Sequence, residues 1–224
     1  MERATREALR DLRAAADPTR RPGMARVGID VRHALGVSVP NIRRIARRVG
    51  RDHRVAMGLW ESGVHEARIL ATLVAEPAAM TGREMESWVA EITSWDVGDF
   101  AADLFASTRL GHAKIPAWSR RPEGFVKRCA FAMIARRAVS AKQAPDAEFL
   151  RYLTLIRRGA TDDRNEVRKG VSWALRQIGK RNVALHAAAV AEAEALLELD
   201  SRSARWIARD ALRELRSEAV RERR

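Results

Sequence analysis

The chain has 224 residues and a formal net charge of +13, from 42 Lys and Arg against 29 Asp and Glu. This length supports one sizeable core, and the charge favours polyanions as partners over acidic proteins or neutral metabolites. No stretch offers the roughly 20 apolar residues that a membrane span needs, and a single cysteine, Cys129, excludes an internal disulfide. We therefore expect one domain over residues 1–224, monomeric and cytoplasmic (nucleoid-associated in a bacterium), without a membrane partner.

The positive charge is concentrated near the N-terminus. Between Arg20 and Arg54, ten arginines face only two acids, Asp30 and Asp52. Two explanations stay open, the codon bias of a GC-rich genome and the binding of phosphates by guanidinium groups. The second explanation assigns these arginines of the segment to a DNA-binding surface: Arg26, Arg43, Arg44 and Arg47.

The chain is predicted to be helical throughout. Proline and glycine fall mostly between segments that are rich in Ala, Leu, Arg and Glu and that carry apolar residues at helical spacing. Three related segments begin at residues 126, 167 and 204, which is close to the roughly 40-residue period of HEAT and armadillo repeats. The expected fold is all-α: a C-shaped α-solenoid of HEAT-like repeats with a basic concave face. The alternative is an irregular helix bundle.

A helix predicted from Ser94 onward carries the first candidate site residues. Its apolar stripe consists of Val97, Phe100 and Leu104. Trp95 and Asp99 are four residues apart and stand together on the opposite side. In the alternative interpretation, Asp99 belongs to a capping arrangement whose N-cap is Asp96.

A second helix is predicted over residues 123–136. Its buried face consists of Val126, Ala130, Met133 and Ile134, and Cys129 is expected to be packed in the interior. Arg128 lies opposite this face among Ala132 and Ala135, whose small side chains would let a ligand come close. The alternative is that Arg128 is simply a solvated charge.

A third helix is predicted over residues 166–180, with its own apolar sector. Trp173 projects the other way, within a basic stripe that consists of Lys169, Arg176 and Lys180. A large indole in a basic stripe is typical of a ligand-binding face, although a neighbouring repeat that covers Trp173 would explain it equally well.

The segment Thr-Ser-Trp-Asp-Val-Gly-Asp at 93–99 resembles the signature of the AlkD-like DNA glycosylases, in which a Trp and an Asp four residues later line the DNA cleft. Further matches follow in chain order at 22–26, 36–43, 59–61 and 66–67. The resemblance implies that Arg128 binds phosphate and that Trp173 is the second cleft tryptophan. The chain departs from the family pattern at Ser94, Val27 and Ser38, in the part that would decide which lesion is preferred.

The implied activity is monofunctional excision of alkylated bases from duplex DNA without base flipping. An N3- or N7-alkylated purine is already cationic, so it leaves as a neutral base without a general acid, and one carboxylate suffices. Asp99 would stabilise the sugar cation and position or deprotonate water, while Trp95 and Trp173 would pack against the sugar. The five histidines show no metal-ligand spacing, so neither a metal nor a cofactor is expected.

Two further interpretations belong to this prediction. An open groove would accept bulky N3- or N7-linked adducts as well as methyl lesions, because no closed pocket limits their size. The competing function is a non-catalytic helical-repeat module that binds nucleic acid or scaffolds a partner. Asp99 discriminates between the two functions, since a pure phosphate binder gains nothing from an acid in a basic cleft.

Overall fold

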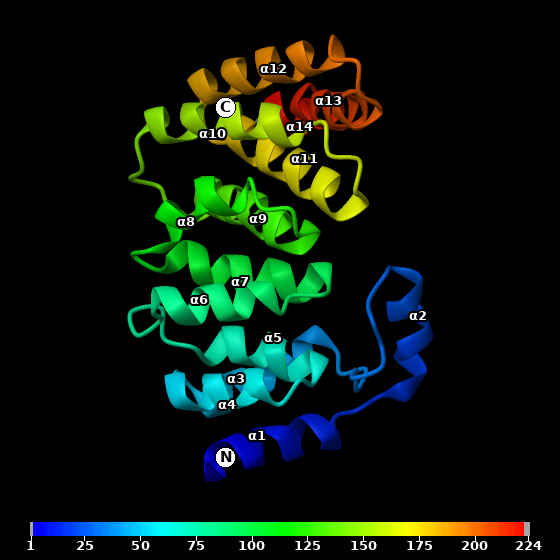
Figure 1. Cartoon of the computed structure of the whole chain (residues 1–224), viewed down its shortest axis with the longest axis vertical. Helices are drawn as coiled ribbons and strands as arrows, with labels where there is room; N and C mark the ends of the chain where they lie inside the picture. Colours follow the sequence, from blue (N-terminus) through cyan, green and yellow to red (C-terminus); the bar gives the residue numbers. More distant parts are fainter. Residues whose placement is uncertain (1, 222–224) are drawn as a thin grey trace. The chain divides into compact units, whose positions relative to one another are not determined.

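The computed structural model describes residues 2–221, which form helices and loops and contain no strand (Figure 1). The all-α prediction is therefore confirmed. The chain divides into two compact units, which are described separately: unit 1 ends at Leu110 and unit 2 begins at Gly111. The single domain over residues 1–224 stays a prediction. Among the described residues, no helix combines the length and the hydropathy that crossing a bilayer requires.

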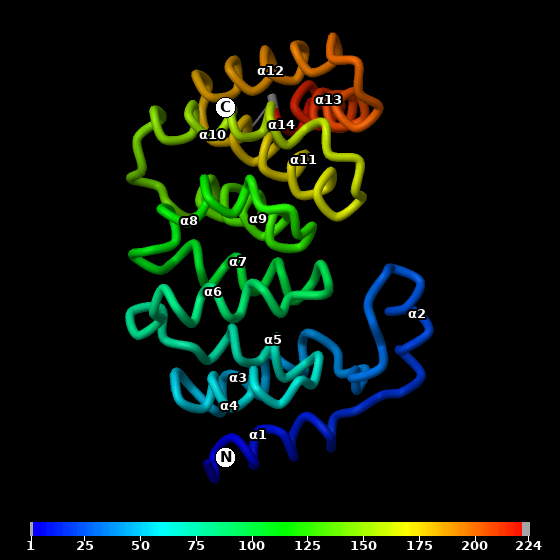
Figure 2. The backbone as a smooth tube through the Cα atoms, in the orientation of Figure 1, coloured from blue at the N-terminus to red at the C-terminus, as the bar shows by residue number. Residues whose placement is uncertain are grey.

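From residue 2 to Leu110, unit 1 contains seven α-helices and one 3-10 helix. These are α1 (Arg3–Ala14), η1 (Pro18–Arg20), α2 (Arg21–Arg26), α3 (Val39–Val49), α4 (His53–Glu61), α5 (His65–Val74), α6 (Gly82–Ala90) and α7 (Trp95–Ser107). Figure 2 follows the chain from α1 out through α2 and back to α3. Helix α5 packs against α3, α4 and α7, so it is the centre of this unit.

Side-chain caps fix where several of these helices begin. The Ser38 hydroxyl accepts from the Asn41 amide at the start of α3, and the Asp52 carboxylate accepts from the Val55 amide at the start of α4. Thr81 and Glu84 form a capping box at α6. Such caps satisfy amides that have no partner within the helix, so these boundaries are set locally by the sequence.

The other seven helices, all within the described part of the chain up to residue 221, belong to unit 2. They are α8 (Gly111–Trp118), α9 (Gly124–Ser140), α10 (Asp146–Gly159), α11 (Asn165–Gly179), α12 (Val183–Leu197), α13 (Arg202–Leu215) and α14 (Glu218–Arg221). The three related segments of the sequence lie on α9, α11 and α13, and α11 packs against both of the others (Figure 1). Cys129 is fully buried in α9, as predicted. The repeat prediction is confirmed within this unit.

Candidate nucleic-acid interface

Trp95 and Asp99 lie one turn apart on α7, away from its buried stripe. Val97 and Leu104 are buried, whereas Trp95 is 38% exposed and Asp99 is half-buried. The helix begins directly at Trp95 after the extended residue Ser94, so the capping alternative for Asp96 and Asp99 is wrong. The predicted stripe needs one correction, because Phe100 is only half-buried. Residues four apart on a helix are neighbours, which places the indole and the carboxylate side by side.

The indole of Trp95 is held by the loop that follows α2. Its Nε1 donates a hydrogen bond to the Val27 carbonyl oxygen at 3.2 Å, across 68 residues of sequence. The Val27 side chain is 57% exposed, and Arg26 beside it is exposed at the end of α2. A partly exposed indole that is tied to backbone keeps its orientation without being covered, as a preformed ligand-binding surface requires.

This loop is in turn tied to the start of α5. The buried Glu66 carboxylate accepts three backbone N–H groups, from Leu35 at 2.8 Å, Gly36 at 2.7 Å and Val37 at 3.2 Å. Gly36 has φ +80°, and a Cβ at that position would lie 2.0 Å from the Asp17 carbonyl oxygen. Only glycine fits there, since other residues disfavour positive φ and would also clash.

Next to Trp95, a contact between the buried His65 and the half-buried Asp96 fixes the first turn of α7. His65 Nε2 lies 2.8 Å from Asp96 Oδ2, and Asp96 Oδ1 also accepts from the Val97 amide. Burial alone lowers the pKa of His65, but the hydrogen bond to Asp96 and its charge outweigh burial and raise it. Burial alone raises the pKa of Asp96, and the same contact lowers it overall. Sequence reasoning missed this pair, for which the only local signal was a second acid directly after Trp95.

The four predicted arginines of unit 1 do not share one surface. All four are exposed, but Arg43 and Arg47 line one pocket of α3, whereas Arg44 lines another with Arg48 and Asp11. The guanidinium of Arg43 lies 5.5 Å from the centre of the Phe100 ring, next to Asp99 in sequence. Arg43 is therefore the predicted cation with a direct link to α7.

In unit 2, Trp173 is half-buried on α11. The guanidinium of Arg136 lies 5.3 Å from the centre of the indole, and the indole Nε1 lies 3.2 Å from the side-chain amide of Gln177. No repeat buries Trp173 completely, so the indole keeps accessible surface. Lys169, one turn earlier, is exposed.

The rest of the predicted basic stripe is engaged within the protein. Glu214 of α13 binds Arg176 and, at 2.5 Å, Lys180, and Arg176 also lies 3.5 Å from Asp210. Burial alone raises the pKa of Glu214, but these two cations outweigh burial and lower it. Two of the three cations of the predicted stripe are thus paired with carboxylates of α13, which the α11 sequence does not reveal.

Arg128 lies in α9 but not in the open surroundings expected for it. It is only 6% exposed, and its Nη1 donates to the Glu166 carbonyl oxygen at 3.0 Å. Ala132 and Ala135 are fully buried, so no ligand approaches over them and this expectation is wrong. The reason is that α8, α10 and α11 all pack against α9 and cover the side that its own periodicity leaves open.

The structure thus groups the predicted residues into two sets. In unit 1, the indole of Trp95 is joined to Val27 and adjoins Asp99; in unit 2, Trp173 stands with Arg136 and near Lys169. Among residues 2–221, no group of three or more His, Cys, Asp or Glu side chains is placed to hold a metal ion. The chemistry available at α7 is that of one carboxylate beside an aromatic face.

Comparisons with known proteins concern the family and the fold of the chain. The family described as DNA alkylation repair enzyme matches residues 8–215. A solved structure from "a new family of proteins related to the HEAT-like repeat DNA glycosylases with affinity for branched DNA structures" superposes with a TM-score of 0.78 at 14% identity, over 93% of this chain and 94% of that one. A designed armadillo repeat protein reaches a TM-score of 0.37 at 14% identity, over 79% and 92%. No curated protein gives a significant match.

Proposed function

Because the chain belongs to the family of DNA alkylation repair enzymes, we propose that it is a monofunctional DNA glycosylase, which hydrolyses the N-glycosidic bond of N3- or N7-alkylated purines in duplex DNA. The observation that carries the proposal is the pairing of Trp95 with Asp99 on the outer side of α7, with the indole anchored to Val27. A net charge of +13 fits a polyanionic substrate.

The chemistry asks for one carboxylate rather than two. The alkylated base carries a positive charge and leaves as a neutral purine, while the deoxyribose becomes oxocarbenium-like. The Asp99 carboxylate stabilises this cation and positions or deprotonates the water that attacks it. The bond between sugar and base breaks, the water oxygen bonds to the sugar carbon, and an abasic site remains.

Trp95 supplies a face for the sugar cation. An aromatic ring attracts a cation over its face by about 0.5–2 kcal/mol. The hydrogen bond to Val27 fixes the ring before DNA binds, so the ring does not have to be oriented during the reaction. Val27 is smaller than the aromatic residue that often follows the corresponding run in the family, and this favours the acceptance of bulky adducts without base flipping.

Unit 2 is assigned the roles that the resemblance implies. Trp173 acts as the second indole, and Arg128, which is 6% exposed, acts as a phosphate ligand. Lys169 binds the DNA backbone directly, whereas a phosphate reaches Arg176 and Lys180 only if it displaces Glu214 from them.

The test is base release from N7-methylguanine duplexes under single-turnover conditions. Asp99→Asn keeps the size of the side chain but removes its charge, so we expect the rate to fall by at least about 100-fold while affinity is retained. Asp103→Asn, one turn further along the same helix, is the matched control and should excise normally. Near-wild-type excision by Asp99→Asn excludes the proposed mechanism.

A second candidate function is non-catalytic binding of branched DNA, the affinity named for the structurally similar protein. It shares the positive charge but has no use for Asp99. Absence of base release by the wild type, combined with tighter binding to a four-way junction than to a linear duplex of equal length, would favour this candidate.

A further inference from the structure

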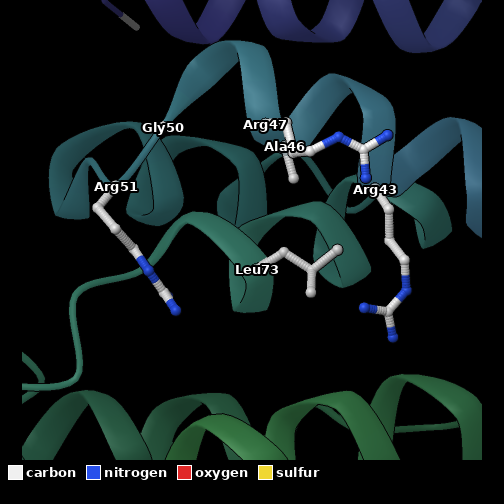
Figure 3. Close-up of a pocket in the computed structure, with 6 residues that line it drawn as sticks. All are labelled: Arg43, Ala46, Arg47, Gly50, Arg51 and Leu73. Atoms are coloured by element: carbon white, nitrogen blue, oxygen red, sulfur yellow. The ribbon is translucent and has the colours of Figure 1, made fainter.

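Three arginines of unit 1 line a pocket of about 260 Å³ at the end of α3 (Figure 3). The lining residues are Arg43, Ala46, Arg47, Gly50, Arg51 and Leu73. None of them is acidic. In Figure 3, Leu73 of α5 lies between the side chains of Arg43 and Arg51. The pocket therefore has a cationic rim and an apolar floor.

The chain builds this rim with a helix turn and a glycine. Arg43 and Arg47 are four residues apart and share one face of α3. The helix ends at Gly50, whose φ of +74° suits glycine alone. The chain turns at this glycine, and the next residue, Arg51, also lines the pocket. The Arg51 guanidinium donates to the Ala75 carbonyl oxygen, which holds it at the pocket. The course of the backbone thus places the three arginines at the pocket, and no ion pair is needed to hold them there.

No carboxylate among the residues that line the pocket neutralises its positive charge. Within the described residues, neither Arg43 nor Arg47 has a hydrogen-bond or ion-pair partner, and the Arg43 guanidinium lies over the ring of Phe100. The carboxylate next in sequence, Asp52, is engaged in capping α4. The C-terminal end of α3 contributes roughly half a negative elementary charge, which is small against three guanidinium groups. An anion that enters the pocket relieves the mutual repulsion of these groups.

The size and the floor of the pocket restrict what that anion is. Pockets that enclose a small molecule usually measure about 300–1,000 Å³, so 260 Å³ with an open mouth suits a group rather than a whole metabolite. Guanidinium forks match phosphate oxygens, and an apolar floor of Ala46 and Leu73 suits the carbon face of a sugar. Free phosphate would leave that floor unused.

We propose that this pocket binds one phosphodiester of the DNA backbone, shared by Arg43, Arg47 and Arg51, with the attached deoxyribose against Leu73. The assignment of DNA as the ligand rests on the proposed function. The contact carries no sequence information; instead it sets where the backbone lies relative to α7, because Arg43 also lies on the Phe100 ring beside Asp99. Arg51, which sequence analysis did not assign, becomes a DNA ligand.

The number of phosphates is measurable, because each neutralised phosphate contributes about 0.9 to the slope of log K against log salt concentration. Binding of undamaged duplex is measured for the wild type, for each single Arg→Gln variant and for the triple variant R43Q/R47Q/R51Q. If the three arginines share one phosphate, the magnitude of the log–log slope should be smaller by about 0.9 in the triple variant than in the wild type. Arg54→Gln on α4, which removes an exposed arginine outside the pocket, is the matched control and should leave the slope unchanged.

An unchanged slope in the triple variant, or an equal loss in Arg54→Gln, overturns the site. A loss about three times larger shows three separate phosphates and overturns the shared contact. Base release by the wild type from methylated duplex is measured in parallel. If the wild type releases no base but the slope of the triple variant falls by the value for one phosphate, the glycosylase proposal fails and the pocket proposal stands. If the wild type excises the base but the triple variant keeps the full slope, the pocket fails and the glycosylase proposal stands.

Discussion

His65 of α5 and Asp96 of α7 form a largely buried pair that joins the centre of unit 1 to the turn that carries Trp95. The contact lies at 2.8 Å, and the His65 backbone N–H also donates to the His33 carbonyl oxygen at 3.0 Å. The start of α7 is therefore fixed by a group that titrates, so its stability depends on pH.

We expect the contact between His65 and Asp96 to stabilise the fold only between the lowered pKa of Asp96 and the raised pKa of His65. The raised pKa of His65 means that its contribution is complete below the usual histidine pKa and is lost as pH rises through the raised value. The lowered pKa of Asp96 means that its contribution is present above the usual aspartate pKa and is lost as pH falls through the lowered value. Asp96→Asn should reduce the free energy of unfolding by about 2 kcal/mol near pH 6 and by less at pH 9.

Chemical denaturation across pH 4–9 checks this, with Asp103→Asn on the same helix as the control. A constant difference between Asp96→Asn and the wild type at every pH would contradict the assignment of the titration to this pair.

The anchored indole predicts a graded loss of activity. Trp95→Phe keeps an aromatic face but removes the N–H that donates to the Val27 carbonyl oxygen. The net contribution of such a hydrogen bond is about 1 kcal/mol, so we expect the excision rate to fall roughly 5-fold. Trp95→Ala removes the face as well, so we expect a larger loss, roughly 10-fold or more, in the single-turnover excision rate. Trp206→Phe, in α13 beneath Arg168, serves as a control for loss of an indole elsewhere. Equal rates for the Phe and Ala variants of Trp95 would refute the role of the ring.

Two cations on α11 should respond differently to substitution. Lys169 is exposed, and Lys169→Gln is expected to make the salt dependence of duplex binding shallower by about 0.9, the value for one phosphate. Arg176 is already bound to Glu214 and Asp210, so Arg176→Gln should leave the slope nearly unchanged and instead lower the thermal midpoint. Fluorescence anisotropy over a salt series measures the slopes. The opposite ranking would mean that DNA displaces Glu214 from Arg176.

The open surface beside Trp95 predicts tolerance of large lesions. Release of N7-methylguanine is compared with release of a bulky minor-groove N3-adenine adduct from otherwise identical duplexes. We expect both to be excised, because no pocket has to enclose the base. Val27→Trp, which fills the edge next to the Trp95 indole at a position where Val27 is exposed, should slow the bulky substrate more than the methyl one. Complete refusal of the bulky adduct by the wild type would rule out the open-groove account.

The sequence by itself determined the helical elements and the outward face of α7. Which residues share one side of a helix depends on positions three and four apart, so the separation of Trp95 and Asp99 from Val97 and Leu104 is written locally. The repeat spacing behind α9, α11 and α13 is likewise a property of the linear sequence.

Only the tertiary structure decided what covers the side opposite each apolar stripe. The periodicity of α9 leaves Arg128 open, yet neighbouring helices bury it, and Glu214 reaches Arg176 across 38 residues. The same holds for His65 and Asp96, which lie 31 residues apart, and for Arg51, which lines the same pocket as Arg43. Periodicity reports the direction of a side chain relative to its own helix, whereas its partners depend on how separate helices pack, and no local pattern encodes that packing.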